Sequence, residues 1–210
     1  MKTNDLSVKL NAIMEKWDFS GCISICKDRE VIYQGYHGYA DYEAGKPNDL
    51  ETRFLIASVT KQFTAACIMI LVEEGKINLQ HTLNNYLPEY TYASQITIRQ
   101  MLNMMSGIPD MINEVIVEEI EQDKTERTQE EQLIFEYQTQ SRCFPLSEVL
   151  ELVNNRELNF EPGTSMNYSN TNYSFLGFIV ERLSGQSLGT FMEERIFRPL
   201  HMNETTCNPS

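Results

Sequence analysis

A serine and a lysine three residues apart, Ser58 and Lys61, stand at the start of a segment with a helical pattern. Residues i and i+3 lie on one face of a helix, so the Lys61 amine can approach the Ser58 hydroxyl. A serine hydroxyl is a weak nucleophile until a base takes its proton, and free N–H groups at a helix start can stabilise an oxyanion. Taken alone, the segment fits a nucleophile with its base and a capping serine with a surface lysine equally well.

Two other serine patterns are interpreted as chance matches. Ser24 and Lys27 have the same spacing, but they fall in a predicted strand, where residues three apart point to opposite faces. Residues 185–189 read Gly-Gln-Ser-Leu-Gly, which matches the G-x-S-x-G of a nucleophile elbow. That elbow needs a preceding strand and a later acid and histidine, whereas this segment joins two predicted helices. We therefore expect Ser187 to cap the second helix.

A second polar pair, Tyr168 and Asn170, follows a turn at residues 160–163, which read Phe-Glu-Pro-Gly. A phenol and an amide two residues apart in an irregular segment can both point into one cleft. With this pair in place, the chain resembles the serine β-lactamase and penicillin-binding protein superfamily. Within it, the chain looks most like the branch of class C β-lactamases, D-Ala-D-Ala peptidases and esterases. The resemblance runs through nearly all of residues 18–206 and is carried by four stretches: 53–61, 102–109, 160–170 and 196–202.

The resemblance implies a role for each residue of the two motifs. Ser58 would be the nucleophile that becomes acylated, and Lys61 and Tyr168 would together move its proton. Asn170 would orient Lys61 and bind the substrate amide. The implied function is a serine hydrolase that forms an acyl-enzyme with a β-lactam, a D-alanyl peptide or an ester. No cofactor and no metal are expected.

The family's third motif, Lys-Thr-Gly or His-x-Gly on a strand, is expected well after residue 206, and no Lys-Thr-Gly occurs in the sequence. The strand that carries it supplies one backbone donor of the oxyanion hole, and losing such a donor typically costs about 10²–10³ in kcat. We therefore expect either the N-terminal part of a longer hydrolase or a truncated relative. The alternative function is a non-catalytic module that binds peptidoglycan or β-lactams with a degenerate site.

The elements that must position these residues follow from hydrophobic spacing. The pattern predicts an N-terminal amphipathic helix, then a hairpin with strands at 21–27 and 31–39. Residues 58–74 form the expected central helix, which Gly75 ends. From residue 77 to 197 almost every patterned segment is helical.

We expect one β-lactamase-related domain over residues 1–210. Residues 1–75 would hold the N-terminal helix, the hairpin and the nucleophile helix, and residues 76–210 a mainly helical lobe with the Tyr-x-Asn loop. The expected fold class is α+β of the β-lactamase/transpeptidase type. Two strands alone do not make a stable sheet. The resemblance implies that strands near the C-terminus of the family's domain complete it, so we expect an incomplete sheet in this chain.

The charge of the chain excludes two classes of partner. The 210 residues carry 17 Lys and Arg against 30 Asp and Glu, for a net charge of −13. Nucleic acids and anionic membrane surfaces repel such a chain. The resemblance implies a small-molecule or peptide substrate. Residues 114–136 alone contribute −7. This segment is interpreted as a solvent-exposed helical face, with a docking surface for a basic partner as the alternative.

Two further patterns bear on the compartment. No signal peptide is visible at the start, and no apolar run approaches the roughly 18 residues of a transmembrane helix. The five cysteines are scattered and are interpreted as free thiols. As the sequence stands we expect a reducing, cytoplasmic environment, and an extracytoplasmic one if a leader is missing.

Overall fold

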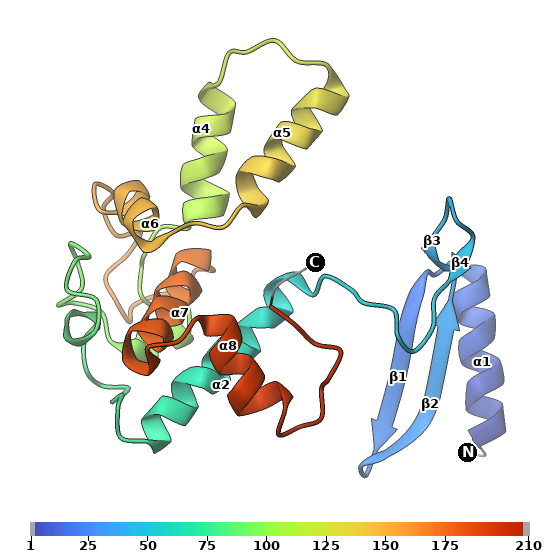
Figure 1. Ribbon diagram of the computed structural model, residues 1–210. Coiled ribbons are helices and arrows are strands. Elements are labelled where there is room, and N and C mark those ends of the chain that lie inside the picture. The colour runs from blue at the N-terminus through green and yellow to red at the C-terminus, as the bar shows by residue number, and fades with distance from the viewer. Residues whose placement is uncertain (1–2, 208–210) are drawn as a thin grey trace. The chain divides into compact units, whose positions relative to one another are not determined.

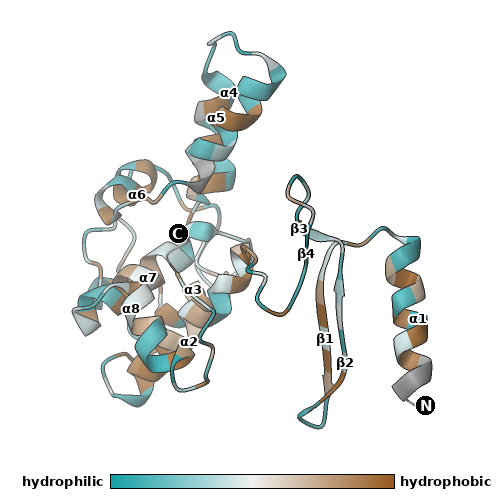
Figure 2. Cartoon of the chain, turned by 45° about the vertical axis from the view of Figure 1, so that its right-hand side comes forward, coloured by the Kyte–Doolittle hydropathy of each residue, from teal (hydrophilic) through white to brown (hydrophobic). Residues whose placement is uncertain are grey.

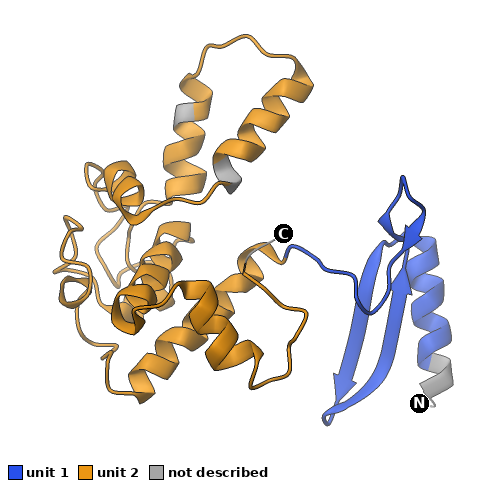
Figure 3. Cartoon of the chain, in the orientation of Figure 1, with its two compact units in different colours: residues 1–55 blue, residues 56–210 orange. Residues whose placement is uncertain are grey.

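The computed structural model describes residues 3–207, including all side chains except those of residues 3–5, 119, 140 and 141. The chain forms two compact units that divide between Leu55 and Ile56 (Figure 3). The helix that follows Ser58 belongs to the second unit, whereas the expectation from the sequence grouped it with the hairpin in residues 1–75.

The first unit combines one helix with two small sheets. Its elements are α1 (Thr3–Lys16), β1 (Gly21–Lys27), β2 (Glu30–His37), β3 (Tyr39–Asp41) and β4 (Lys46–Pro47). Hydrophobic residues recur among hydrophilic ones along α1, as expected of the predicted amphipathic helix (Figure 2). β1 and β2 pair antiparallel as the predicted hairpin, and the Tyr33 hydroxyl of β2 donates a hydrogen bond of 2.8 Å to Asn11 Oδ1 of α1.

The second predicted strand, 31–39, is interrupted at Gly38, which corrects its predicted extent. Gly38 has a φ of +66°, and a Cβ on it would lie 2.9 Å from the Cα of Ser20. Only glycine fits this turn, because it combines a left-handed backbone with a close approach. The chain leaves the hairpin there, and β3 pairs with β4 in a separate two-stranded sheet.

The second unit is almost entirely helical. In chain order its elements are η1 (Ala57–Val59), α2 (Thr60–Glu73), η2 (Leu83–Asn85), α3 (Ile98–Leu102), η3 (Met111–Ile116), α4 (Val117–Gln122), α5 (Gln129–Ser141), α6 (Leu146–Val153), α7 (Asn170–Ser184), α8 (Leu188–Met192) and η4 (Glu193–Phe197). η1 and η2 are 3₁₀ turns, and η3 and η4 are π-helical turns. Together the two units give the expected α+β fold class with a sheet that is incomplete in this chain.

The core of the second unit forms around α2, which packs against α7 and α8 (Figure 1). Ile68 and Leu71 of α2 and Phe175 and Ile179 of α7 are completely buried. Burying a large apolar side chain stabilises a fold by about 1.5–3 kcal/mol. Gly75, with a φ of +71°, ends α2 as predicted. The core therefore holds α2 and α7, the two helices at whose starts the motif residues lie, in a fixed arrangement.

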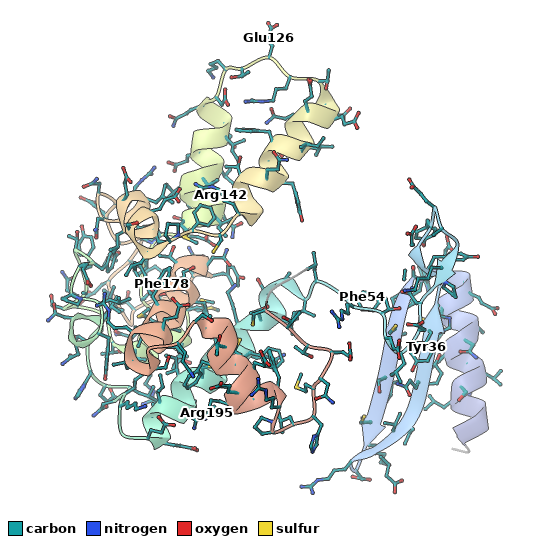
Figure 4. All side chains as sticks on the ribbon, viewed as in Figure 1. Tyr36, Phe54, Glu126, Arg142, Phe178 and Arg195 are labelled. Carbon is teal, nitrogen blue, oxygen red and sulfur yellow. The ribbon has the colours of Figure 1, made fainter. Side chains whose placement is uncertain are left out.

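The acidic segment forms the helical pair α4 and α5, which lie side by side (Figure 1). Thr128 and Glu131 cap the start of α5 through reciprocal hydrogen bonds. Glu126 stands in the connection between the two helices (Figure 4). Glu118, Glu121 and Glu130 are also exposed, which agrees with a solvent-exposed helical face.

Within residues 3–207, no helix combines the length and the apolar character needed to cross a membrane.

Candidate active site

Ser58 lies in η1, immediately before the first turn of α2. The preceding residue, Ala57, has a φ of +42°, in the left-handed region that costs an L-residue about 1–2 kcal/mol. The Val59 amide donates a hydrogen bond of 3.0 Å to the Ile56 carbonyl oxygen and closes the turn. Backbone strain of this kind is concentrated at functional sites. The turn leaves Ser58 exposed to solvent at the start of a helix that buries one face.

Lys61 is one helical turn further along the chain, and its side chain contacts Ser58. Its Nζ donates hydrogen bonds of 3.1 Å to Ser58 Oγ and of 2.7 Å to Asn170 Oδ1. The ammonium also lies 4.7 Å from the ring centre of Tyr168 and 5.8 Å from that of Tyr173. The i, i+3 contact expected from the sequence is therefore present, and two aromatic faces stabilise the cation beside it.

Tyr168 contacts the same serine although it lies 110 positions later in the chain. Its hydroxyl is 2.5 Å from Ser58 Oγ and donates a hydrogen bond of 3.2 Å to Asn170 Oδ1. Ser58 Oγ thus lies between the Lys61 amine and the Tyr168 phenol. Tyr168 is 42% exposed, so a solute can reach the three groups.

Asn170 is the first residue of α7 and connects the site to a buried carboxylate. Its Oδ1 accepts from Lys61 and Tyr168, and its Nδ2 donates to Asp110 Oδ1 at 3.2 Å and Oδ2 at 3.0 Å. The four residues selected from the sequence, Ser58, Lys61, Tyr168 and Asn170, therefore form one hydrogen-bonded group.

The start of α7 is held against residues 106–111 by a row of buried hydrogen bonds. Ser106 Oγ donates to Asn172 Oδ1 at 2.6 Å, and Thr171 Oγ1 donates to the Pro109 carbonyl at 2.7 Å. The Met111 amide donates in turn to Thr171 Oγ1 at 2.9 Å. Buried polar groups that are fully paired make a rigid contact. This contact fixes the position from which Asn170 extends into the site.

Two residues of the site were not selected from the sequence. Asp110, 1% exposed, follows directly on the stretch 102–109 that carries the resemblance and caps η3 through the amides of Ile112 and Asn113. An aspartate before a helical segment is a capping signal, but nothing in the sequence pairs it with Asn170. Tyr173 donates to the Leu102 carbonyl at 3.1 Å. Burial, and secondly the nearby Tyr168, raises the pKa of Tyr173, so it remains a neutral phenol.

The two other serine patterns lie elsewhere in the structure. Ser187 is the N-cap of α8 and accepts a hydrogen bond of 3.1 Å from the Thr190 amide, which confirms the predicted cap. Ser24 and Lys27 both lie in β1, which confirms the predicted strand. Neither pattern has the structural context of a nucleophile.

Comparison with known proteins gives a consistent result along the chain. A family model described as "Beta-lactamase" matches residues 11–210. Penicillin-binding protein 4* of Bacillus subtilis is 29% identical over 206 residues, which cover 97% of this chain and 41% of that protein. The chain thus spans about two fifths of the length of this curated relative.

Solved structures with the same fold include a penicillin-binding protein and an amidohydrolase. The penicillin-binding protein of Bacillus halodurans has a TM-score of 0.74 and 28% identity, over 94% of this chain and 56% of that one. A D-stereospecific amidohydrolase from Streptomyces has a TM-score of 0.60 and 28% identity, over 71% of this chain and 43% of that one. Since the family model matches all but the first ten residues and the folds agree, this chain belongs to the beta-lactamase family.

Proposed function

We propose that this protein is a serine hydrolase that forms an acyl-enzyme through Ser58. The observation that supports this most directly is the position of Ser58 Oγ, 3.1 Å from Lys61 Nζ and 2.5 Å from Tyr168 OH. A nucleophilic hydroxyl within hydrogen-bond distance of a proton acceptor is the arrangement that acyl transfer requires.

In the proposed reaction, Ser58 Oγ attacks the carbonyl carbon of the substrate. The new Oγ–C bond forms as the Oγ–H bond breaks, and the proton passes to the Lys61–Tyr168 pair, which accepts it in the form that holds one proton fewer than an ammonium and a phenol. When the tetrahedral intermediate collapses, the bond from carbon to the leaving nitrogen or oxygen breaks, and the pair returns the proton to that atom. A water molecule then adds to the ester carbon as the pair takes one of its protons. The bond between that carbon and Oγ breaks, the pair returns the proton to Oγ, and the acyl group leaves as a carboxylic acid. Asn170 holds Lys61 in place throughout.

The proposed substrates are carbonyl compounds of the kinds named by the relatives. The matching proteins include penicillin-binding proteins and a D-stereospecific amidohydrolase, so a β-lactam or a D-configured amide is the first choice, with D-alanyl peptides and esters in the same class. Because the chain spans about two fifths of the curated relative, the proposal concerns the whole protein that carries this segment. We regard residues 1–210 as part of one hydrolase domain.

Adduct formation tests the proposal. The purified protein is incubated with a fluorescent penicillin and with an activated nitrophenyl ester, and intact-mass spectrometry followed by peptide mapping locates the acyl group. We expect an adduct on Ser58 that is absent from Ser58→Ala. Ser24→Ala is the matched control, because Ser24 has the same spacing to a lysine but lies in β1. The proposal is wrong if neither probe acylates the protein, or if Ser58→Ala is acylated as fast as the unsubstituted protein.

A further inference from the structure

We propose that Asp110 is a positioning residue that determines which end of the Asn170 amide faces Lys61; this inference rests on the proposed function. Asp110 is 1% exposed, and both oxygens of its carboxylate accept hydrogen bonds. It accepts hydrogen bonds from the amides of Ile112 and Asn113 at 2.9 and 3.2 Å and from Asn113 Nδ2 at 2.6 Å. Asn170 Nδ2 donates to both oxygens of the same carboxylate, at 3.2 Å from Oδ1 and 3.0 Å from Oδ2.

The inference follows from the two different ends of an amide. A lysine ammonium only donates hydrogen bonds, and a carboxylate only accepts them. With Oδ1 toward Lys61 and Nδ2 toward Asp110, Asn170 satisfies both neighbours. The reversed amide would place an NH₂ against an ammonium and a carbonyl against a carboxylate. Asp110 therefore excludes the reversed amide and keeps Oδ1 available to Lys61 at 2.7 Å and to Tyr168 at 3.2 Å.

The substitution Asp110→Asn isolates this effect, because asparagine is isosteric and is also a good N-cap. Its Oδ1 can continue to accept from the backbone amides of Ile112 and Asn113, which leaves its Nδ2 facing the Nδ2 atoms of both Asn113 and Asn170. Both side-chain amides then turn their carbonyls toward position 110, and Asn170 turns its NH₂ toward Lys61. The lysine loses its acceptor and its fixed position beside Ser58.

The first measurement is the steady-state hydrolysis of an activated ester, which lacks the amide that Asn170 could bind. Asp110→Asn should lower kcat about ten- to hundredfold, the effect of one charge-assisted hydrogen bond, with KM nearly unchanged. The control is Ser187→Ala, which removes the N-cap hydrogen bond of α8 from the Thr190 amide and leaves Asn170 and Asp110 untouched. Ser187→Ala should lower the melting temperature and retain kcat. Equal kcat in Asp110→Asn and the unsubstituted protein would overturn the inference.

The second measurement does not depend on catalysis. In the exchanged double variant Asp110→Asn/Asn170→Asp, the new amide at position 110 can donate to the new carboxylate at position 170. That carboxylate can in turn accept from Lys61. The double variant should therefore melt at a higher temperature than Asn170→Asp, in which two carboxylates meet. Strictly additive losses of stability would overturn the coupling between the two positions. If the two positions are coupled but no adduct forms on Ser58, the contact between Asp110 and Asn170 is supported and the proposed hydrolase function is rejected. The two proposals can therefore fail separately.

Discussion

At the scale of single residues, the candidate site divides into exposed reacting groups and buried supports. Ser58 and Tyr168 are exposed, whereas Asp110, Thr171 and Asn172 are each at most 1% exposed. Exposure allows a substrate to reach the hydroxyl and the phenol. Burial keeps water away from the supporting hydrogen bonds, which are stronger in a medium of low dielectric constant. The precision of the site therefore comes from residues that no substrate contacts.

The Tyr168 hydroxyl is the group to remove first. Tyr168→Phe keeps the ring beside Lys61 but loses the hydroxyl 2.5 Å from Ser58 Oγ. Positioned proton transfer contributes about 10²–10⁴ in rate, so acylation of Ser58 should slow by a factor in that range. Time-resolved intact-mass spectrometry with a β-lactam measures the rate.

Tyr173→Phe is the matched control for this variant. It also retains a ring beside Lys61 and loses a hydroxyl, but that hydroxyl bonds the Leu102 carbonyl. Its acylation rate should stay near that of the unsubstituted protein. If Tyr168→Phe is acylated as fast as Tyr173→Phe, the phenol takes no part in proton transfer.

The sequence predicted these residues unevenly, for physical reasons. The contact between Ser58 and Lys61 is local, so helical spacing alone makes it accessible to prediction. Tyr168 and Ser58 are 110 positions apart in the sequence, so spacing does not predict their contact. Only the family resemblance predicted that they share a site. The contact between Asp110 and Asn170 is equally non-local and has no motif of its own, so it emerged only from the structure.

At the scale of elements, the loop before η3 is fixed by backbone pairing. The Asn159 and Gly163 amides donate hydrogen bonds of 2.8 Å to the Gly107 and Met105 carbonyls. Gly107 has a φ of +77°, and a Cβ on it would overlap the Phe160 carbonyl oxygen. The turn that precedes Tyr168 and the loop that leads to Asp110 are therefore held together at a position where no side chain fits.

Substitution of Gly107 by alanine should be much worse than the same change at another glycine. Gly185 has a similar φ, +72°, but no atom lies within 4 Å of its added Cβ. Gly185→Ala should cost only the left-handed strain, about 1–2 kcal/mol. Gly107→Ala should cost about 1–3 kcal/mol more, because the methyl group also displaces backbone.

Chemical denaturation of the two variants measures this difference. Equal losses of stability would show that the close approach at Phe160 contributes nothing. An adduct assay on the same samples should find Ser58 of Gly107→Ala slower to react, since displacement of this loop also moves Asp110.

Most elements followed from hydrophobic periodicity, and the deviations have local causes. The predicted second strand ended early because Gly38 turns the chain away beside Ser20. The central helix, predicted to begin at Ser58, begins as a 3₁₀ turn because Ala57 is left-handed. Periodicity reports which residues are buried, but a single residue in an unusual backbone conformation leaves almost no trace in it.

At the scale of the whole molecule, the second unit carries the core and both motifs, and the first carries two sheets of two strands each. The described residues therefore show the shortage of strands that the sequence predicted. A two-stranded sheet is only marginally stable by itself. The family resemblance predicted the incomplete sheet correctly. It could not predict that the compact units divide before Ser58 rather than after α2, because that division depends on the packing of α2 against α7 and α8.

The buried thiol of Cys67 reports the integrity of the second unit. Burial, and secondly the nearby Cys207, raises the pKa of Cys67 to about 12. The thiolate is the reactive form, so near neutral pH Cys67 should remain protonated and inert while the protein is folded. Exposed Cys26 and Cys143 should react with iodoacetamide in the folded protein.

Mass spectrometry after labelling with and without denaturant tests this expectation. Cys67 should gain a label only in denaturant, or as the pH approaches the pKa of about 12, where its thiolate forms. Labelling of Cys67 as fast as Cys143 in the folded protein would show that the core around α2 opens readily.

The sequence separation within the site has a consequence for how the protein is made. Ser58 and Tyr168 are 110 positions apart, and closing so long a loop costs conformational entropy before the contact contributes any stabilisation. Non-local contacts also slow folding. Individual helices of the second unit can therefore form well before the serine meets its phenol. The nucleophile that we propose at Ser58 therefore remains an ordinary serine in a newly synthesised chain until α2 and α7 have docked.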